Sequence, residues 1–367
     1  MRRKNLLNSL VIVFFYLSIL FLTHKEIFTY HFDQTLIKRY FLSQDITHEV
    51  PGKRLFLSDE DIYISSGYLY AKGADPAGYN FDHPPLLKYL FGYSIILFAN
   101  PYFVQILFGG ALILLVYFTG LKIYRSNVVS IIASLLLTID PLFVDSVSHA
   151  MLDLSEVFFL LLYIVLVLFY KRNYFLSGIV LGLFAGTKSL TTPVFFILLL
   201  SFYQWYKKEF NLKTLMKQII IGGIVFSFLY LQSFIQRGGL FNIFFFALKT
   251  IKYRIVHNVT SFPGASLVLF LTSYFQTWWG KREFLSVATW TIFWPIGLGL
   301  CLFQLKKNIK KKLINAKSLF GAVPILYFFY LGIQAPFPRY FLLVLPFLYL
   351  NFVYVVVNHV KKNGTRI

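Results

Sequence analysis

The sequence contains a single cysteine, three methionines and only fifteen acidic residues in 367. Cys301 can form no disulfide within the chain, which excludes a disulfide framework. Polar stretches are scarce too, since 57% of the residues are hydrophobic and 20% aromatic, with a mean hydropathy of +0.67. Soluble domains rarely have so apolar a composition, so the sequence predicts an integral membrane protein.

Basic residues outnumber acidic ones, and the formal net charge is +20. The lysines and arginines lie at the ends of apolar runs rather than on a polar surface with interleaved aromatics, so we expect no binding to nucleic acid. This distribution is typical of cytoplasmic loops and predicts contact with anionic membrane lipids.

The apolar runs are long enough to cross a hydrocarbon core of roughly 30 Å. We predict an all-α polytopic protein with about ten transmembrane helices, within a range of about nine to eleven. The spans lie at about 5–23, 102–123, 127–143, 173–187, 190–206, 214–235, 284–305, 318–335 and 340–358, with one more that ends at Lys171 and Arg172. Their basic flanks predict that both termini are cytoplasmic.

The chain is expected to form a single membrane-embedded domain over residues 1–367, with no separate soluble domain. The first external loop covers 24–101 and contains an interfacial helix at 86–99, which is too short for a span. The fourth external loop, the second long one, covers 236–283 and contains amphipathic stretches at 241–256 and 265–279. Thirteen of the fifteen acids lie between Glu26 and Glu156. Because acids beside a bilayer are costly unless solvated or functional, their clustering predicts an extracytoplasmic active site.

Two groups of polar residues mark the ends of the segment 58–88. Asp59, Glu60 and Asp61 could supply a general base, or could simply begin an acidic loop. Further along, Asp82, His83, Pro84, Pro85 and Lys88 follow one another closely. An exposed histidine and lysine held by two prolines would suit a phosphate group, whereas the alternative is a proline-terminated loop with a snorkelling lysine.

A second polar group contains Asp145, His149 and Asp153. If the segment from Ser146 is helical, His149 and Asp153 share one face and would present an imidazole and an acid to a cavity. Arg339 and Lys188 lie near span boundaries and would either bind phosphate or anchor the chain at the interface, as would Lys252, Arg254 and His257.

Divalent metal binding is a further hypothesis, and no other cofactor is expected. Mg²⁺ or Mn²⁺ prefers oxygen ligands, which makes Asp61, Asp82 and His83 the candidate site together with the Asp59–Glu60 pair. No spacing among these residues is diagnostic of a metal.

The first-loop residues resemble those of the protein O-mannosyltransferases, in which an acidic pair precedes a His-Pro-Pro-Leu-Gly-Lys motif. The matching residues are Asp59, Glu60, Tyr63, the run Phe81–Leu86 and Lys88. Met151–Asp153, Gly182–Lys188 and Pro338–Phe341 resemble later segments of the same family. The broader similarity is to membrane glycosyltransferases of the GT-C class, including the aminoarabinose transferases of lipid A. Leu87 replaces the motif's glycine and His149 replaces a usual arginine, which leaves the sugar and acceptor open.

The resemblance implies an inverting glycosyltransferase that moves a monosaccharide from a polyprenyl or dolichyl phosphate donor to a hydroxyl of a protein, lipid or glycan. It implies Asp59 as the base, with Glu60 assisting. Asp153 would orient the acceptor or the sugar, and His149 would also contact substrate. His83, Lys88, Arg339 and Lys188 would hold the lipid phosphate or sugar. The rival interpretation is a lipid-linked sugar flippase or other transporter, for which the sequence shows no internal repeat.

Overall fold

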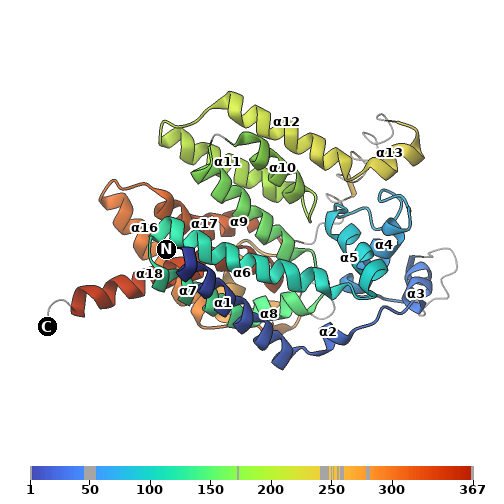
Figure 1. Cartoon of the computed structure of the whole chain (residues 1–367), viewed down its shortest axis with the longest axis horizontal. Coiled ribbons are helices and arrows are strands. Elements are labelled where there is room, and N and C mark those ends of the chain that lie inside the picture. The colour runs from blue at the N-terminus through green and yellow to red at the C-terminus, as the bar shows by residue number, and fades with distance from the viewer. Residues whose placement is uncertain are drawn as a thin grey trace.

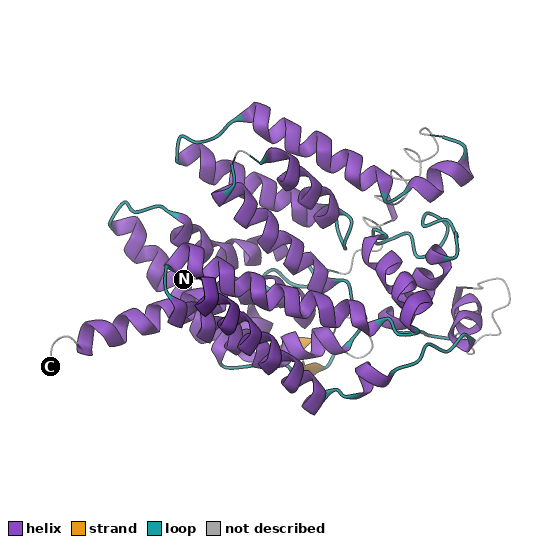
Figure 2. Cartoon of the chain, in the orientation of Figure 1, coloured by secondary structure: helices purple, strands orange, loops and turns teal. Residues whose placement is uncertain are grey.

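The computed structural model describes residues 2–44, 55–171, 173–239, 260–277 and 282–364, and also residues 248, 250, 252, 253 and 256. The described part is almost wholly helical (Figure 2). Its one sheet pairs strand β1 (Tyr274–Gln276) with strand β2 (Phe284–Ser286) in antiparallel register, with Tyr274 opposite Ser286.

Each predicted span overlaps a helix. These helices are α1 (Arg2–Thr23), α6 (Tyr102–Tyr124), α7 (Asn127–Ile139), α8 (Pro141–Ser148), α9 (Asp153–Phe169), α10 (Tyr174–Ala185), α11 (Thr191–Tyr206), α12 (Leu212–Phe228), α13 (Leu231–Arg237), α16 (Phe293–Lys310), α17 (Ala316–Leu331) and α18 (Leu345–Gly364). The prediction of a span from residue 284 is wrong at its start, because 284–286 pairs as a strand and the helix begins at Phe293.

Two helices in the described part are long and apolar enough to cross a membrane, 4–23 and α6. The number rises to four if each of two bent pairs is one span, with α7 and α8 bent by 61° and α12 and α13 by 59°. The chain is therefore an all-α polytopic membrane protein. The count of ten spans, the cytoplasmic termini and the side on which the loops lie stay predictions.

The first predicted external loop folds into four helices at one end of the bundle (Figure 1). They are α2 (Glu26–Thr29), α3 (Thr35–Gln44), α4 (Asp59–Ala71) and α5 (Leu86–Phe98). Helix α4 begins where Ser58 Oγ accepts a hydrogen bond from Asp61 N at 3.0 Å, and its acidic first turn complements the positive end of the helix dipole. Helix α5 confirms the helix predicted at 86–99, and its place at the membrane interface stays a prediction.

The two amphipathic stretches of the other long loop have different outcomes. Most of 241–256 lies outside the described residues. The stretch 265–279 is not one helix, because α15 (Ala265–Thr272) ends at Ser273, which has a left-handed backbone, and β1 follows.

The hydrophobic core lies between α6, α7, α9, α16, α17 and α18. A buried polar node ties these helices together at Asp140. Its carboxylate caps α8 and accepts hydrogen bonds from Trp294 Nε1 at 2.9 Å and from the Tyr349 hydroxyl. The 3₁₀ helix η1 (Pro338–Leu343) packs against α8 and α9 and connects the core to the polar end of the molecule.

Candidate active site

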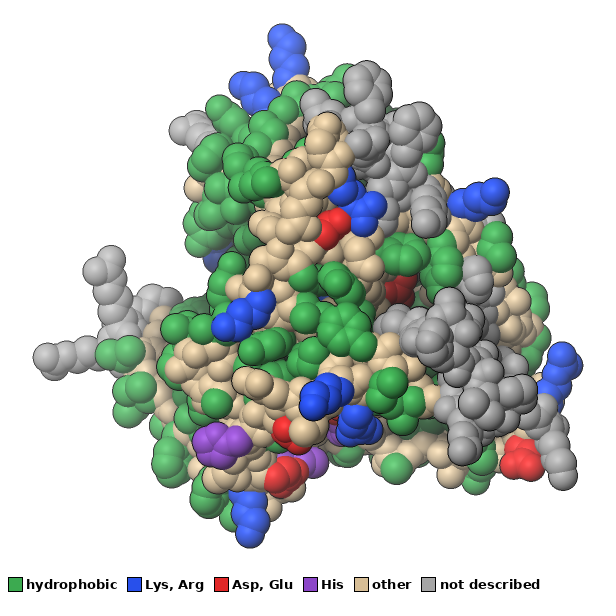
Figure 3. Space-filling model, turned by 90° about the vertical axis from the view of Figure 1, so that its right-hand side faces the viewer, with side chains coloured by type: hydrophobic (Ala, Val, Ile, Leu, Met, Phe, Trp, Pro, Cys, Tyr) green, Lys and Arg blue, Asp and Glu red, His purple; other side chains and the backbone are tan. Residues whose placement is uncertain are grey.

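Two cavities meet at His83, where the first external loop approaches α9, α17 and η1. The Asp59 cavity has a volume of about 470 Å³ and is lined by Tyr40, Phe41, Asp59, Ile62, Tyr63, Gly78, Tyr79, Asn80, Phe81, Asp82, His83 and Tyr253. The Lys188 cavity has a volume of about 280 Å³ and is lined by His83, Glu156, Lys188, Ser189, Thr191, Thr192, Tyr327, Tyr330, Gln334 and Tyr340. Seen from the end that carries α3 and α4, charged and histidine side chains lie among hydrophobic ones (Figure 3).

Asp59 and Arg339 form an ion pair at the edge of the Asp59 cavity. Arg339 Nη1 donates to Asp59 Oδ2 at 2.8 Å, and 46% of the Asp59 side chain is exposed. Burial lowers the pKa of Arg339, but Asp153 and Asp59 outweigh that effect, so its pKa is raised and it stays charged. The guanidinium therefore links α4 to η1 while the Asp59 carboxylate stays accessible to a substrate.

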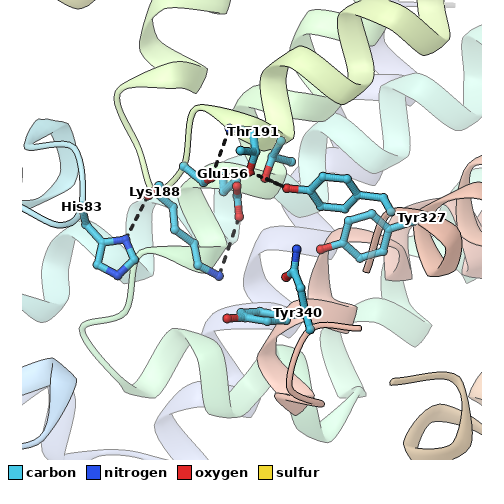
Figure 4. Close-up of a pocket in the computed structure, with 10 residues that line it drawn as sticks. His83, Glu156, Lys188, Thr191, Tyr327 and Tyr340 are labelled. Atoms are coloured by element: carbon cyan, nitrogen blue, oxygen red, sulfur yellow. Dashed lines mark hydrogen bonds and ion pairs between the residues drawn. The ribbon is translucent and has the colours of Figure 1, made fainter. Parts of the chain in front are cut away.

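Asp153, Glu156 and Lys188 form a second, buried charged cluster. The Lys188 ammonium donates to Asp153 Oδ1. It also lies 3.9 Å from Glu156 Oε2, and Figure 4 draws this ion pair. Both carboxylates lie in the first turn of α9 and are only 6% exposed. Burial lowers the pKa of Lys188, yet the two carboxylates raise it by more, so the pKa is raised overall. The ammonium also lies 4.3 Å from the centre of the Tyr340 ring.

His83 lies at the junction of the two cavities with its ring held on both sides. Its Nδ1 lies 2.9 Å from the carbonyl oxygen of Lys188, so Nδ1 carries the proton and donates. Its Nε2 lies 3.5 Å from Asp82 Oδ2, and the Tyr63 ring meets the imidazole edge to face at 5.7 Å. The side chain is thus fixed where both cavities can be reached.

Lys88 is buried, which corrects the expectation of an exposed lysine. Its side chain is 0% exposed and lines neither cavity. The ammonium donates to Asn80 O at 2.6 Å, to Asn80 Oδ1 at 2.8 Å and to His83 O at 2.8 Å. It therefore contacts the loop that carries His83.

The prediction that His149 and Asp153 share one helix face is wrong. Helix α8 ends at His149, whose backbone is extended, and α9 begins only at Asp153. The intervening turn is held from outside, because Glu60 Oε1 accepts a hydrogen bond from Ala150 N at 2.6 Å. Gln105 Nε2 donates to the carbonyl oxygens of His149 and Met151 at 2.6 and 2.7 Å. His149 Nδ1 faces Asp145, not Asp153.

The candidate metal residues are not brought together as a triad. Asp82 and His83 are neighbours, but Asp61 lies toward Tyr30 and Tyr102 on the other side of α4. Over the described ranges, no group of three His, Cys, Asp or Glu side chains could hold a metal ion. Lys252 lines neither cavity, while Arg254 and His257 lie outside the described residues.

Comparison with known proteins places this arrangement among solved folds. No protein-family model and no curated protein matches the sequence. Among solved structures, ArnT from Cupriavidus metallidurans bound to undecaprenyl phosphate aligns over 88% of this chain at 15% identity, with a TM-score of 0.62. The apo state of the same protein aligns over 88% at 14% identity, with a TM-score of 0.59. The chain has the fold of a GT-C membrane glycosyltransferase.

The GT-C likeness has a limited extent. This chain spans 59% of the length of the undecaprenyl phosphate-bound ArnT and 58% of the apo protein. At 14–15% identity, the comparison establishes the fold, and the site has to be argued from its own geometry.

Sequence reasoning missed the hydroxyl-rich wall of the Lys188 cavity within this GT-C fold. Tyr327 and Tyr330 lie three residues apart in α17, and Thr191 Oγ1 lies 2.7 Å from the Tyr330 hydroxyl. Their i, i+3 spacing on one helix face was an available signal, but tyrosines within an apolar run are also typical of membrane interfaces. Only the packing of α17 against the start of α11 brings these hydroxyls together.

Proposed function

We propose that this chain is an inverting glycosyltransferase that moves a monosaccharide from a polyprenyl or dolichyl phosphate donor to a hydroxyl acceptor on the extracytoplasmic side of the membrane. The observation that carries the proposal is the junction at His83. One cavity there presents an accessible carboxylate, and the other presents a cation among hydroxyl groups. The likeness to an ArnT that binds undecaprenyl phosphate supports a polyprenyl phosphate as the lipid part of the donor.

Asp59 is the proposed base, and the Asp59 cavity is the proposed acceptor site. The acceptor hydroxyl oxygen attacks the anomeric carbon while its proton passes to the Asp59 carboxylate. The new carbon–oxygen bond forms on the face opposite the phosphate, so the configuration inverts. A carboxylate on which only one oxygen contacts Arg339 keeps an accessible lone pair for this proton.

The Lys188 cavity is the proposed site for the sugar and its phosphate. As the bond between the anomeric carbon and the phosphate oxygen breaks, the electron pair stays on that oxygen and polyprenyl phosphate leaves. Cations near the developing charge lower the barrier. Lys188 and Arg339 are charged, and His83 would donate from Nε2 when its ring is protonated, since its Nδ1 already donates to the Lys188 carbonyl oxygen. These three are the proposed phosphate contacts.

Glu60, Asp153 and His149 act on the proposed reaction through their neighbours. Glu60 holds the turn at Ala150, and Asp153 fixes the Lys188 ammonium. His149 ends α8 beside Asp145 and lines neither cavity. These residues are proposed to shape the site, while Asp59 carries out the proton transfer.

The test is transfer of a radiolabelled sugar from undecaprenyl phosphate to an added acceptor mixture by the purified protein in detergent. A transferase forms the glycosylated product without a closed membrane, whereas a flippase forms none. We expect Asp59→Asn to lower kcat about 10²–10⁴-fold, the usual contribution of a positioned base. The matched control, Asp61→Asn, removes a neighbouring acid that faces away from the cavity. Equal turnover by wild type and Asp59→Asn would exclude Asp59 as the base.

A further inference from the structure

The Lys88 side chain is fully buried. It lies near the start of α5, which packs so closely on α4 that a Cβ added at Gly92 would lie 1.9 Å from the Gly67 carbonyl oxygen. A Cβ added at Gly67 would lie 2.3 Å from the carbonyl oxygen of Lys88 itself. The crossing therefore brings the Lys88 backbone directly against α4.

The face of α4 toward this crossing presents two aromatic rings to the ammonium. Tyr63 and Tyr70 lie seven residues apart, two helical turns on one side of α4. Lys88 Nζ lies 6.0 Å from the Tyr63 ring centre and 5.6 Å from that of Tyr70. These ring faces replace part of the lost hydration of the charge.

Among the described contacts, the ammonium also donates to three oxygens of one short loop. Two belong to Asn80 and one is the carbonyl oxygen of His83, at 2.6, 2.8 and 2.8 Å. An ammonium has three N–H donors, so these oxygens match its donors in number. Asn80 has a φ of +39°, a backbone conformation that needs external support, and its side-chain amide donates to Asp82 Oδ1 at 2.9 Å.

We infer that Lys88 is a positioning residue that fixes the 80–83 loop, and with it His83, and that it is not itself a phosphate ligand. A phosphate at Nζ would have to displace the loop oxygens and reach an atom that solvent does not reach. The displaced carbonyls would then be buried without donors, which is costly. Phosphate contact therefore falls to His83, Lys188 and Arg339. The part of this assignment that concerns phosphate rests on the proposed function. The part that concerns the loop rests on the Lys88 contacts alone.

The structural half is tested by thermal unfolding of the purified full chain in detergent. Lys88→Met keeps most of the unbranched side chain and removes all three donors, while Asn80→Ala removes one acceptor and the bond to Asp82. We expect each variant to lower the unfolding midpoint by several degrees, and the double variant to lower it by less than the sum, because both break one network. Lys72→Met is the matched control, since the Lys72 ammonium lies 5.7 Å from the centre of the Tyr68 ring in α4 and the substitution should leave the midpoint unchanged. An unchanged midpoint in Lys88→Met would overturn the inference.

The functional half is tested by a binding cycle with undecaprenyl phosphate as the probe, which needs no knowledge of the sugar. If Lys88 acts through His83, Lys88→Met weakens binding no more than His83→Ala does, and the double variant binds as His83→Ala alone. Arg339→Met, which removes a direct cation, weakens binding about tenfold or more in either background. If the double variant instead loses the product of the two single effects, Lys88 is an independent ligand and the inference fails.

The two tests separate the inference from the function on which it rests. Wild type that binds no undecaprenyl phosphate, together with coupled stability of Lys88 and Asn80, would contradict the proposed donor and leave the positioning role standing. Wild type that binds the lipid, with independent loss in Lys88→Met, would contradict the positioning role and leave the donor standing.

Discussion

Two acidic pairs in this protein begin helices in the same way and end in different surroundings. Asp59 and Glu60 lie in the first turn of α4, and Asp153 and Glu156 lie in the first turn of α9. Each pair gains from the positive end of its helix. Asp59 is 46% exposed and borders a cavity, whereas Asp153 and Glu156 are 6% exposed and share the Lys188 ammonium.

This difference shows that the role of an acid at a helix start depends more on its counterion than on its local sequence. A buried carboxylate must keep its cation, because an unpaired charge in a low-dielectric surrounding is costly. The Asp153 pair is therefore suited to fixing Lys188 beside the cavity. The accessible Asp59 can exchange its partner for a substrate, as a base has to.

The largest effect on this comparison is expected from Lys188→Met. It leaves two buried carboxylates without their cation and should lower the free energy of unfolding by about 3–5 kcal/mol. Lys171→Met is the matched control, because Lys171 and Glu209 pair at 2.6 Å with 48% and 40% of their side chains exposed. That pair should contribute less than about 1 kcal/mol. Chemical denaturation in detergent measures both, and equal losses would remove the distinction between buried and exposed pairs.

The second prediction distinguishes the role of Glu60 from that of Asp59. Glu60→Ala removes the acceptor for Ala150 N, a charge-assisted hydrogen bond that contributes about 1.5–3 kcal/mol to stability. Glu60→Gln keeps an acceptor oxygen and should recover most of that loss. Unfolding midpoints together with turnover check this, since Asp59→Asn should lower turnover with little change in stability. If Glu60→Gln were as inactive as Asp59→Asn while remaining stable, the two acids would share the chemistry.

Sequence patterns predicted the helices of the apolar runs and the α5 helix, because apolar run length determines these features. They did not predict that helices begin at Asp59 and at Asp153. They could not predict the pairing of Asp153 with Lys188, which are 35 residues apart and meet only through the packing of α9 against the segment after α10. The helix break at His149 was missed for the same reason. Glu60 and Gln105, distant in the chain, hold that turn.

Lys88 shows the same limit in one side chain. The sequence shows that Lys88 follows His83, Pro84 and Pro85, and that a lysine there would suit a phosphate group. Its burial depends on the crossing of α4 and α5 at Gly67 and Gly92, which no short motif describes. Its burial decides that the ammonium contacts a protein loop and not a ligand.

The smallest effect is expected from a third acid, Asp75, whose surroundings are intermediate between those of Asp59 and those of Asp153. Asp75 accepts hydrogen bonds from Ala77 N at 2.8 Å, from Ser233 and from Arg237, and so joins the loop after α4 to α13. Burial raises the pKa of Asp75, but these three donors lower it by more, so the folded-state pKa lies below the ordinary value of 3.8. The carboxylate is thus more acidic in the folded protein than in the unfolded chain, and its contribution is complete above about pH 4.

That contribution should be lost as the pH falls from about 4 through the lower folded-state pKa. We expect wild type to lose more stability between about pH 6 and pH 3 than Asp75→Asn, whose amide cannot titrate. Thermal unfolding at each pH measures the difference, and Asp61→Asn, which keeps the Asp75 contacts, should follow wild type. Identical pH profiles for wild type and Asp75→Asn would mean that the junction with α13 does not depend on the charge of this carboxylate, and that Asp75 resembles the accessible Asp59 more than the buried Asp153.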